Sequence, residues 1–150
     1  MKSEQLFQLL ISYNKCHDIC EGLSEEAICC FEKSNSITLP SELKSLYRVF
    51  DGGEIFIPGT LIYGIKQSSK RKTLLEVNSK VSRGNYTIPS NYLVVAKLNF
   101  GDLICINLNN PYNVIQWDHE TDKQYCFWAS LFEWLEESIK EYKDYEEGAN

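Results

Sequence analysis

The most constraining feature of this chain is a series of short apolar runs between residues 93 and 129. The runs are "LVVAKL" (93–98), "LICINL" (103–108), "NVIQWD" (113–118) and "QYCFWA" (124–129). They are rich in β-branched and aromatic residues, which favour strands. The connections between them are too short for a crossover helix, so neighbouring strands must run antiparallel. The sequence therefore predicts an antiparallel meander.

Helical patterns precede this region. Leu6, Leu9, Leu10 and Tyr13 share one side of a predicted helix over residues 3–14. A second helix is expected to begin after Ser24 as N-cap and to run to about Lys33. Its predicted apolar face consists of Ala27, Cys30 and Phe31.

A third helix is predicted after Leu39 and Pro40, because proline suits the first turn of a helix. Its apolar residues recur at i, i+3, i+4 and i+7, and they are Leu43, Leu46, Tyr47 and Phe50. Two adjacent glycines, Gly52 and Gly53, are expected to end this helix. No helix begins there, so the glycine pair is not expected to hold a phosphate.

Strands are then predicted at residues 54–57 and 61–65, joined by a turn at Pro58 and Gly59. A polar segment follows, with a short helix around Thr73 to Lys80. The final helix begins at Ser130 and Glu133, which form a capping box. Its acidic C-terminal tail, residues 140–150, is expected to fray from Tyr145. The fold class predicted is α+β, with helices packed around a mainly antiparallel sheet in a single domain spanning residues 1–150.

The charge of the chain is acidic and unevenly distributed. The net charge is −6, which argues against a nucleic-acid partner and suits a basic protein partner. Residues 133–150 hold seven acidic and two basic side chains, a net charge of −5. Residues 66–83 hold six basic and one acidic side chain, a net charge of +5. Solvated surface and polar interaction face both remain open for these two segments.

No membrane-spanning or secretory segment is predicted. No apolar run reaches the roughly 18 residues that a bilayer crossing needs. The first residues hold no uninterrupted apolar region and no cleavage site of small residues. A cytoplasmic protein is therefore expected.

Six cysteines are present, and without a secretory signal they are expected to be reduced. Cys105 and Cys126 lie in apolar runs and are predicted to be packed. Cys16, His17 and Cys20, followed by the adjacent pair Cys29 and Cys30, resemble a metal cluster, but their spacing fits zinc poorly. Free thiols are the preferred interpretation, and no metal or cofactor is predicted.

Catalytic patterns are not found. Catalysis by a serine or cysteine nucleophile would need one of only two histidines, His17 or His119. Asp118, His119, Glu120 and Asp122 form a predicted hairpin turn whose acidic side chains face solvent. A metal or acid–base site in that turn is the alternative. No catalytic residue is predicted.

The order of landmarks resembles the SUKH superfamily of fungal cell-wall regulators (Smi/Knr type) and bacterial toxin-immunity proteins. The resemblance covers residues 21–139. It rests on Glu32 before Leu39-Pro40, on Gly52-Gly53 after a helix, and on Gly64 in the strand "LIYGI". The remaining landmarks are Gly101-Asp102 before a strand, Trp117 in "NVIQWDHET", and Phe132 opening the last helix. Where the family often has a glycine, this chain has Asn35-Ser36, and asparagine tolerates the left-handed conformation required there.

The resemblance implies a non-catalytic fold that binds a partner protein. The expected partner is a cognate toxin, basic and of nuclease or deaminase type. A regulatory or scaffold protein of the Smi/Knr type is the alternative. The predicted binding face is acidic, with the protein a monomer or weak dimer, and the residues expected to contact the partner are Glu54, Asp102, Asp118, Glu120 and Asp122.

Overall fold

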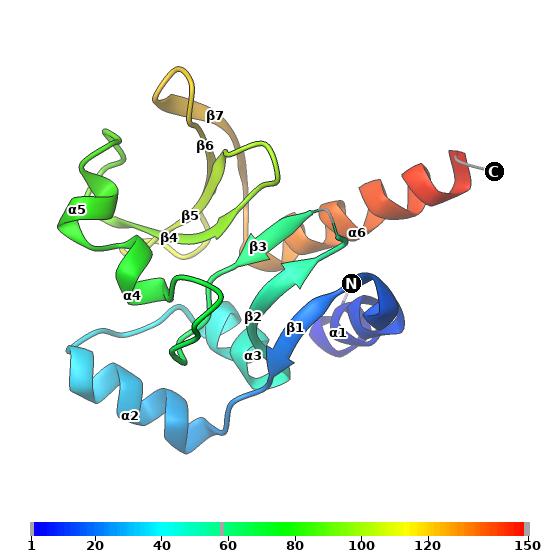
Figure 1. Cartoon of the computed structure of the whole chain (residues 1–150), viewed down its shortest axis with the longest axis horizontal. Coiled ribbons are helices and arrows are strands. Elements are labelled where there is room, and N and C mark those ends of the chain that lie inside the picture. The colour runs from blue at the N-terminus through cyan, green and yellow to red at the C-terminus, as the bar shows by residue number, and fades with distance from the viewer. Residues whose placement is uncertain (1, 58, 149–150) are drawn as a thin grey trace.

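The computed structural model describes residues 2–57 and 59–148, and these residues form an α+β fold around a seven-stranded antiparallel sheet (Figure 1). The strands lie in the sheet in chain order, so each pairs only with its neighbours in sequence. The strands are β1 (Asp18–Glu21), β2 (Phe50–Ile55), β3 (Thr60–Ile62), β4 (Tyr92–Lys97), β5 (Leu103–Asn107), β6 (Val114–Asp118) and β7 (Lys123–Trp128). The helices are α1 (Ser3–Ser12), α2 (Glu25–Asn35), α3 (Ser41–Val49), α4 (Leu74–Val77), α5 (Lys80–Arg83) and α6 (Leu131–Gly148), with a 3₁₀ turn η1 (Asn14–Cys16).

The predicted meander is confirmed. Strands β4 to β7 begin and end within one residue of the predicted runs, and each pairs antiparallel with the next. In the pairing of β5 with β6, Leu103 lies opposite Trp117 and Ile104 lies opposite Gln116. The side chains of residues that lie opposite each other share one face of the sheet.

The prediction that the glycine pair ends α3 is wrong. Helix α3 ends at Val49, and Gly52 and Gly53 lie inside β2 with φ angles of 72° and 127°. A Cβ atom on Gly53 would lie 2.6 Å from the Cα of Ile19 in β1. Gly53 therefore lets β1 approach β2 closely, and both glycines have positive φ angles that other residues rarely adopt.

Strand β1 was not predicted. It is short and mostly exposed, and its sequence "DICE" shows no alternation of apolar and polar residues. It forms because the edge of β2 is available, with Asp18 opposite Glu54 and Ile19 opposite Gly53. Tertiary pairing thus overrides a weak local preference.

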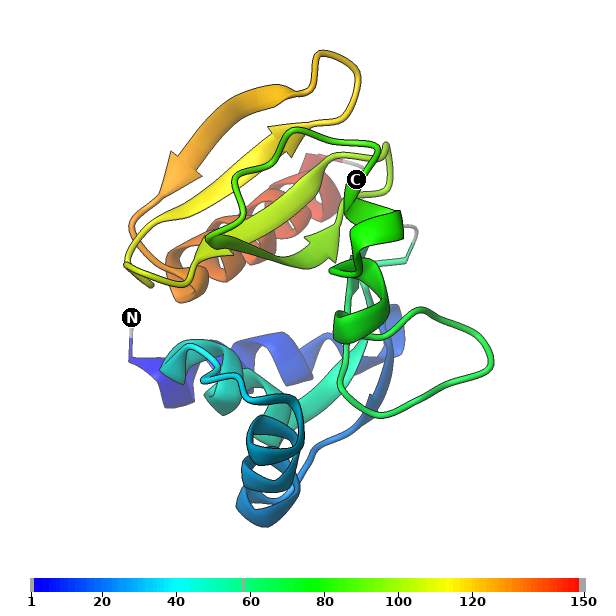
Figure 2. The same ribbon diagram turned by 90° about the vertical axis from the view of Figure 1, so that its left-hand side faces the viewer.

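Helices cover the two faces of the sheet unequally (Figure 2). Helices α1 and α3 pack against α6, α3 also contacts β2, and α6 contacts β7. Helix α4 packs against β4 on the opposite face, together with the polar segment that precedes β4.

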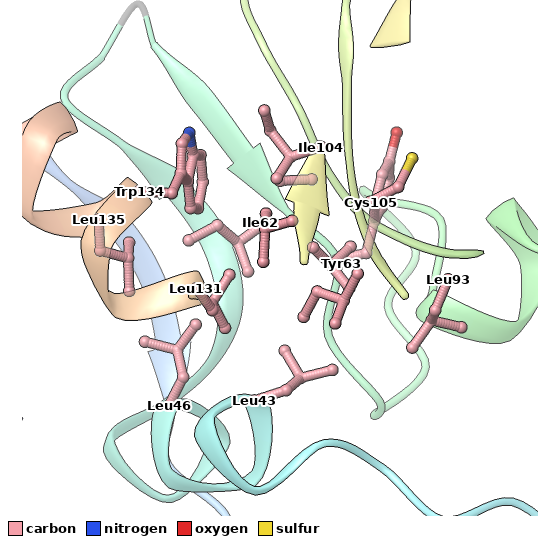
Figure 3. Packing of buried hydrophobic residues seen from close by; sticks show 14 of the residues in the cluster. Leu43, Leu46, Ile62, Tyr63, Leu93, Ile104, Cys105, Leu131, Trp134 and Leu135 are labelled. Atoms are coloured by element: carbon pink, nitrogen blue, oxygen red, sulfur yellow. The ribbon is translucent and has the colours of Figure 1, made fainter. Parts of the chain in front are cut away.

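The core lies mainly between α3, α6 and the sheet (Figure 3). Leu43 and Leu46 of α3 and Leu131, Trp134 and Leu135 of α6 are buried there. Residues of the sheet complete the same cluster, among them Ile62, Tyr63, Leu93, Ile104 and Cys105.

Three helical details differ from prediction. In α2, Ile28 is buried and Phe31 is half-buried, whereas Ala27 and Cys30 are exposed, so the buried side of this helix is shifted by about one residue from the predicted one. The left-handed residue after α2 is Ser36 (φ 50°), not Asn35. Helix α6 continues to Gly148 instead of fraying from Tyr145, since neither proline nor glycine interrupts it earlier.

Two further predictions concern a short helix and a turn. The helix expected around Thr73 to Lys80 is present as two one-turn helices, α4 and α5. The predicted turn at Pro58 and Gly59 falls partly on residue 58, which lies outside the described residues. Across residues 2–57 and 59–148, no helix has the length and apolar composition that a membrane crossing requires.

Candidate protein-binding site

Two turns at one end of the sheet are joined through Asp102 and His119. Asp102 follows the β4–β5 turn, and its carboxylate accepts hydrogen bonds from the backbone N–H of His119 (3.0 Å) and from Gln116 (2.8 Å). The His119 ring Nδ1 lies 2.6 Å from the same carboxylate. Asp102 is only 5% exposed. Burial alone would raise the pKa of Asp102, but the hydrogen bonds from His119 and Gln116 outweigh it and the pKa is lowered.

Gly101 lets this pairing form. Its φ angle is 110°, and a Cβ atom there would lie 2.9 Å from His119 Nε2. A side chain at position 101 would thus push against the imidazole ring. The Gly-Asp landmark therefore has a physical role, in which glycine gives space to the ring and aspartate binds it.

The β6–β7 turn is ordered by its own carboxylates. Asp118 accepts hydrogen bonds from the backbone N–H groups of Glu120 and Thr121. Asp122 has a φ of 55° and accepts hydrogen bonds from the Thr87 backbone and from the Trp117 indole. These hydrogen bonds lower the pKa of Asp122, and the bond from the Thr87 backbone has the largest effect. Glu120 is left exposed at the tip.

The structure brings together four of the five residues predicted to contact a partner. Asp102, Asp118, Glu120 and Asp122 lie at the same end of the sheet, across the β4–β5 and β6–β7 turns. Their exposure differs, because Asp102 is turned inward and Asp122 is occupied by Thr87 and Trp117. Glu54 lies apart on β2, opposite Asp18 and Leu61.

The alternative of a metal or acid–base site in this turn has partial geometric support. One ligand atom each of Asp102, Asp118 and His119 lies within 4.8 Å of the others. The carboxylate oxygens already accept protein N–H groups, which competes with binding a cation. Across the described part of the chain, no serine, threonine or cysteine side chain hydrogen-bonds to the His119 ring, as a triad would require.

A cleft of about 490 Å³ lies next to this end of the sheet. It is bounded by the β2–β3 and β4–β5 connections, by residues of β6 and β7, and by α6, whose last turns project beyond the sheet (Figure 1). Its volume falls in the range of typical ligand sites. Aromatic side chains form much of the wall, namely Phe56, Phe100, Trp128, Trp134, Tyr142 and Tyr145.

Two carboxylates of α6, Glu137 and Glu141, supply the charge of this cleft. The Trp128 indole N–H donates to Glu137. Burial, and then the charge of Glu137, raise the pKa of Glu141. The β6–β7 turn, with Asp118, Glu120 and Asp122, is called the acidic turn below. The β4–β5 turn connects the cleft to it, because Phe100 lines the cleft and the next residue, Gly101, lies against the His119 ring.

This cleft was not predicted from the sequence. Its residues come from five separate parts of the chain, and Glu137 and Glu141 were counted only as members of a charged segment. The sequence signal that indicates this pair is the spacing of four residues between Glu137 and Glu141, which places both carboxylates on one side of a helix.

The cysteines and His17 of the N-terminal segment, which resemble a metal cluster in sequence, contact other parts of the protein. The Cys16 sulfur lies 3.1 Å from the Tyr142 hydroxyl, and the His17 ring bridges the Leu10 carbonyl (2.9 Å) and the Phe56 backbone N–H (3.0 Å). Cys29 and Cys30 are exposed on α2. Among the described residues, these cysteines and His17 do not converge as one group of ligands.

The basic segment 66–83 lies on the other face of the sheet. Arg71 pairs with Asp18 at 2.6 Å, and Arg83 donates to the carbonyls of Tyr92, Ile88 and Pro89. Buried Asp51 fixes the start of the segment by accepting the N–H groups of Ile65 (2.7 Å) and Lys66 (2.9 Å). Part of this basic charge therefore serves the fold.

Other landmarks are structural as well. Glu32 accepts the backbone N–H of Leu39 (2.8 Å), which fixes the chain before Pro40 and α3. A Cβ atom on Gly64 would lie 2.4 Å from the Asp51 carbonyl oxygen. Trp117 is buried, and the Phe132 ring packs edge-to-face on Phe7, with centroids 5.4 Å apart.

Comparison with known proteins identifies the family. No curated protein matches the sequence. A crystal structure of a protein from Pseudomonas syringae pv. tomato is similar in fold, with a TM-score of 0.65 and 14% sequence identity. The similarity covers 87% of this chain and 93% of that chain. The model of the SMI1 / KNR4 family (SUKH-1) matches residues 22–137. Because this match spans most of the sequence, the chain belongs to the SMI1/KNR4 family.

Proposed function

We propose that this protein is a non-catalytic immunity protein, which binds a basic toxin in the cytoplasm of the producing cell and blocks its activity. The family to which the chain belongs includes toxin-immunity proteins, and its members bind partner proteins. A toxin that acts on nucleic acid carries basic residues in its own site, so an acidic inhibitor can cover that site.

The observation that carries this proposal is the concentration of acidic groups at one end of the sheet. Asp118 and Glu120 in the β6–β7 turn and Glu137 and Glu141 in the adjoining cleft belong to surfaces linked by the β4–β5 turn. The electrostatic fields of these four carboxylates add. At longer distances, the net charge of −6 contributes a negative potential of the same sign. A basic partner would be steered to this end and would bind faster at low ionic strength.

The test is co-expression of the chain with the toxin domain encoded beside its gene. The native chain is expected to restore growth and to form a complex that survives gel filtration. Failure to restore growth, together with failure to form the complex, would contradict the proposal.

A charge-reversal pair locates the surface. Glu120→Lys should slow association with the toxin by about tenfold and weaken its dependence on salt, because steering is lost. Glu4→Lys on α1 makes the same charge change at an exposed position away from the acidic turn. If both variants associate at the native rate, the acidic turn is not the surface that receives the partner.

A further inference from the structure

The cleft beside α6 has an imbalance of charge. Glu137 and Glu141 lie one helical turn apart and both line it. Like charges at this spacing destabilise each other. No lysine or arginine is among the described residues that line the cleft. Burial first, and then the charge of Glu137, raise the pKa of Glu141. A cation entering the cleft would relieve this repulsion.

The walls of the cleft select the kind of cation. Phe100 and Tyr145 are exposed, by 59% and 74%, and Trp128 is held in place by its bond to Glu137. Aromatic faces attract cations and stack well on a planar guanidinium. A carboxylate can also accept two parallel hydrogen bonds from a guanidinium, which an ammonium group cannot match.

We propose that this cleft receives an arginine side chain from the partner protein, with its guanidinium between the aromatic wall and the carboxylates of Glu137 and Glu141. The inference rests on the proposed function, since it assigns a contact within the same binding surface. A cleft of about 490 Å³ also has room for the backbone that carries the arginine. Exposed Ile57 and Phe100 at its opening offer apolar contacts to that backbone.

A peptide titration tests the inference without the toxin. The probe is acetyl-Gly-Arg-Gly-amide, and the readout is the NMR signals of the Phe100 and Tyr145 backbone N–H groups. The arginine peptide should shift these signals with a dissociation constant on the order of 1 mM. The corresponding citrulline peptide has nearly the same shape without the charge and should cause no shift. The lysine peptide should bind more weakly than the arginine peptide.

Matched variants separate the cleft from the general acidity of the helix. The double variant Glu137→Gln/Glu141→Gln should bind the arginine peptide at least about tenfold more weakly, since two charge-assisted contacts are lost. The double variant Asp144→Asn/Glu147→Gln removes two charges from the same helix at residues that do not line the cleft. It should bind within about twofold of the native chain, because distant surface charges are screened.

Three results would overturn the inference. They are an absence of shifts with the arginine peptide, equal shifts with the citrulline peptide, and equal weakening in the two double variants. The toxin complex distinguishes this inference from the proposed function. If Glu137→Gln/Glu141→Gln binds the toxin as tightly as the native chain, the cleft receives no arginine from the toxin and the immunity function stands. If the native chain binds the arginine peptide but no toxin, the site stands and the function is wrong.

Discussion

The carboxylate of Asp102 accepts a hydrogen bond from the backbone N–H of His119 and lies 2.6 Å from its ring Nδ1. This pair ties the β4–β5 turn to the β6–β7 turn and so holds the end of the sheet that carries the proposed binding surface. Asp102 is buried in the process, and Glu120 remains exposed.

Asp102 should make the stability of the fold depend on pH. Because its pKa is lowered in the folded protein, its contribution is complete above the unfolded value of about 3.9 and is lost as pH falls through the lower, folded value. Asp102→Asn should lower the free energy of unfolding at pH 7 by about 1–3 kcal/mol. The difference from the native chain should shrink towards pH 3, as measured by urea denaturation. Glu120→Gln serves as the control and should change stability at pH 7 by less than about 0.5 kcal/mol.

Gly101 should tolerate no side chain. Gly101→Ala forces a Cβ atom against the His119 ring at a φ angle of 110°, which should cost about 1–3 kcal/mol. Thermal denaturation should show a Tm lower by roughly 2–12 °C. Gly148→Ala is the matched control, since nothing lies within 4 Å of that position. Equal melting of the two variants would mean that the β4–β5 turn can shift without cost.

Asp51 should control the mobility of the basic segment. Asp51→Ala removes the acceptor of the Ile65 and Lys66 N–H groups, and each lost partner should cost about 1–3 kcal/mol. Hydrogen exchange measured by NMR should then be faster at these two amides than in the native chain. Glu54→Ala, a change at a half-buried position in the same strand, should leave both amides protected. Unchanged exchange in Asp51→Ala would show that other contacts hold the segment.

The cysteines should differ in reactivity. Burial raises the pKa of the Cys105 thiol to about 12, so this residue stays protonated and inaccessible at pH 8. Iodoacetamide followed by mass spectrometry should label Cys20, Cys29 and Cys30 in the folded protein and spare Cys105. All six should react in denaturant. Labelling of Cys105 at the rate of Cys29 would mean that β5 opens readily.

The sequence predicted the parts of this fold that depend on neighbouring residues. The strands from β4 to β7 and the helix after Ser130 follow from local patterns of apolar and capping residues. Glu133 donates its backbone N–H to the Ser130 hydroxyl at 3.1 Å, as the capping motif requires. Such signals lie within a few residues of one another and can be read without the tertiary structure.

The features that were missed depend on contacts between distant residues. The role of Gly53 is visible only when β1 is beside it, because β1 precedes it by more than thirty residues. Asp102 looked like a surface acid, yet His119 and Gln116 enclose it from another hairpin. The cleft joins Phe56, Phe100 and Tyr145, and no sequence period connects them.

The order of the strands has a consequence for how the chain folds. Since every strand pairs with its neighbour in sequence, the sheet can extend strand by strand from the N-terminus, without waiting for a later segment to insert between two earlier ones. Loop-closure entropy is then small at most steps, a property of fast-folding chains. During synthesis, β1 to β7 can associate as they leave the ribosome. Helix α6 comes last and covers the apolar face that the growing sheet has left exposed.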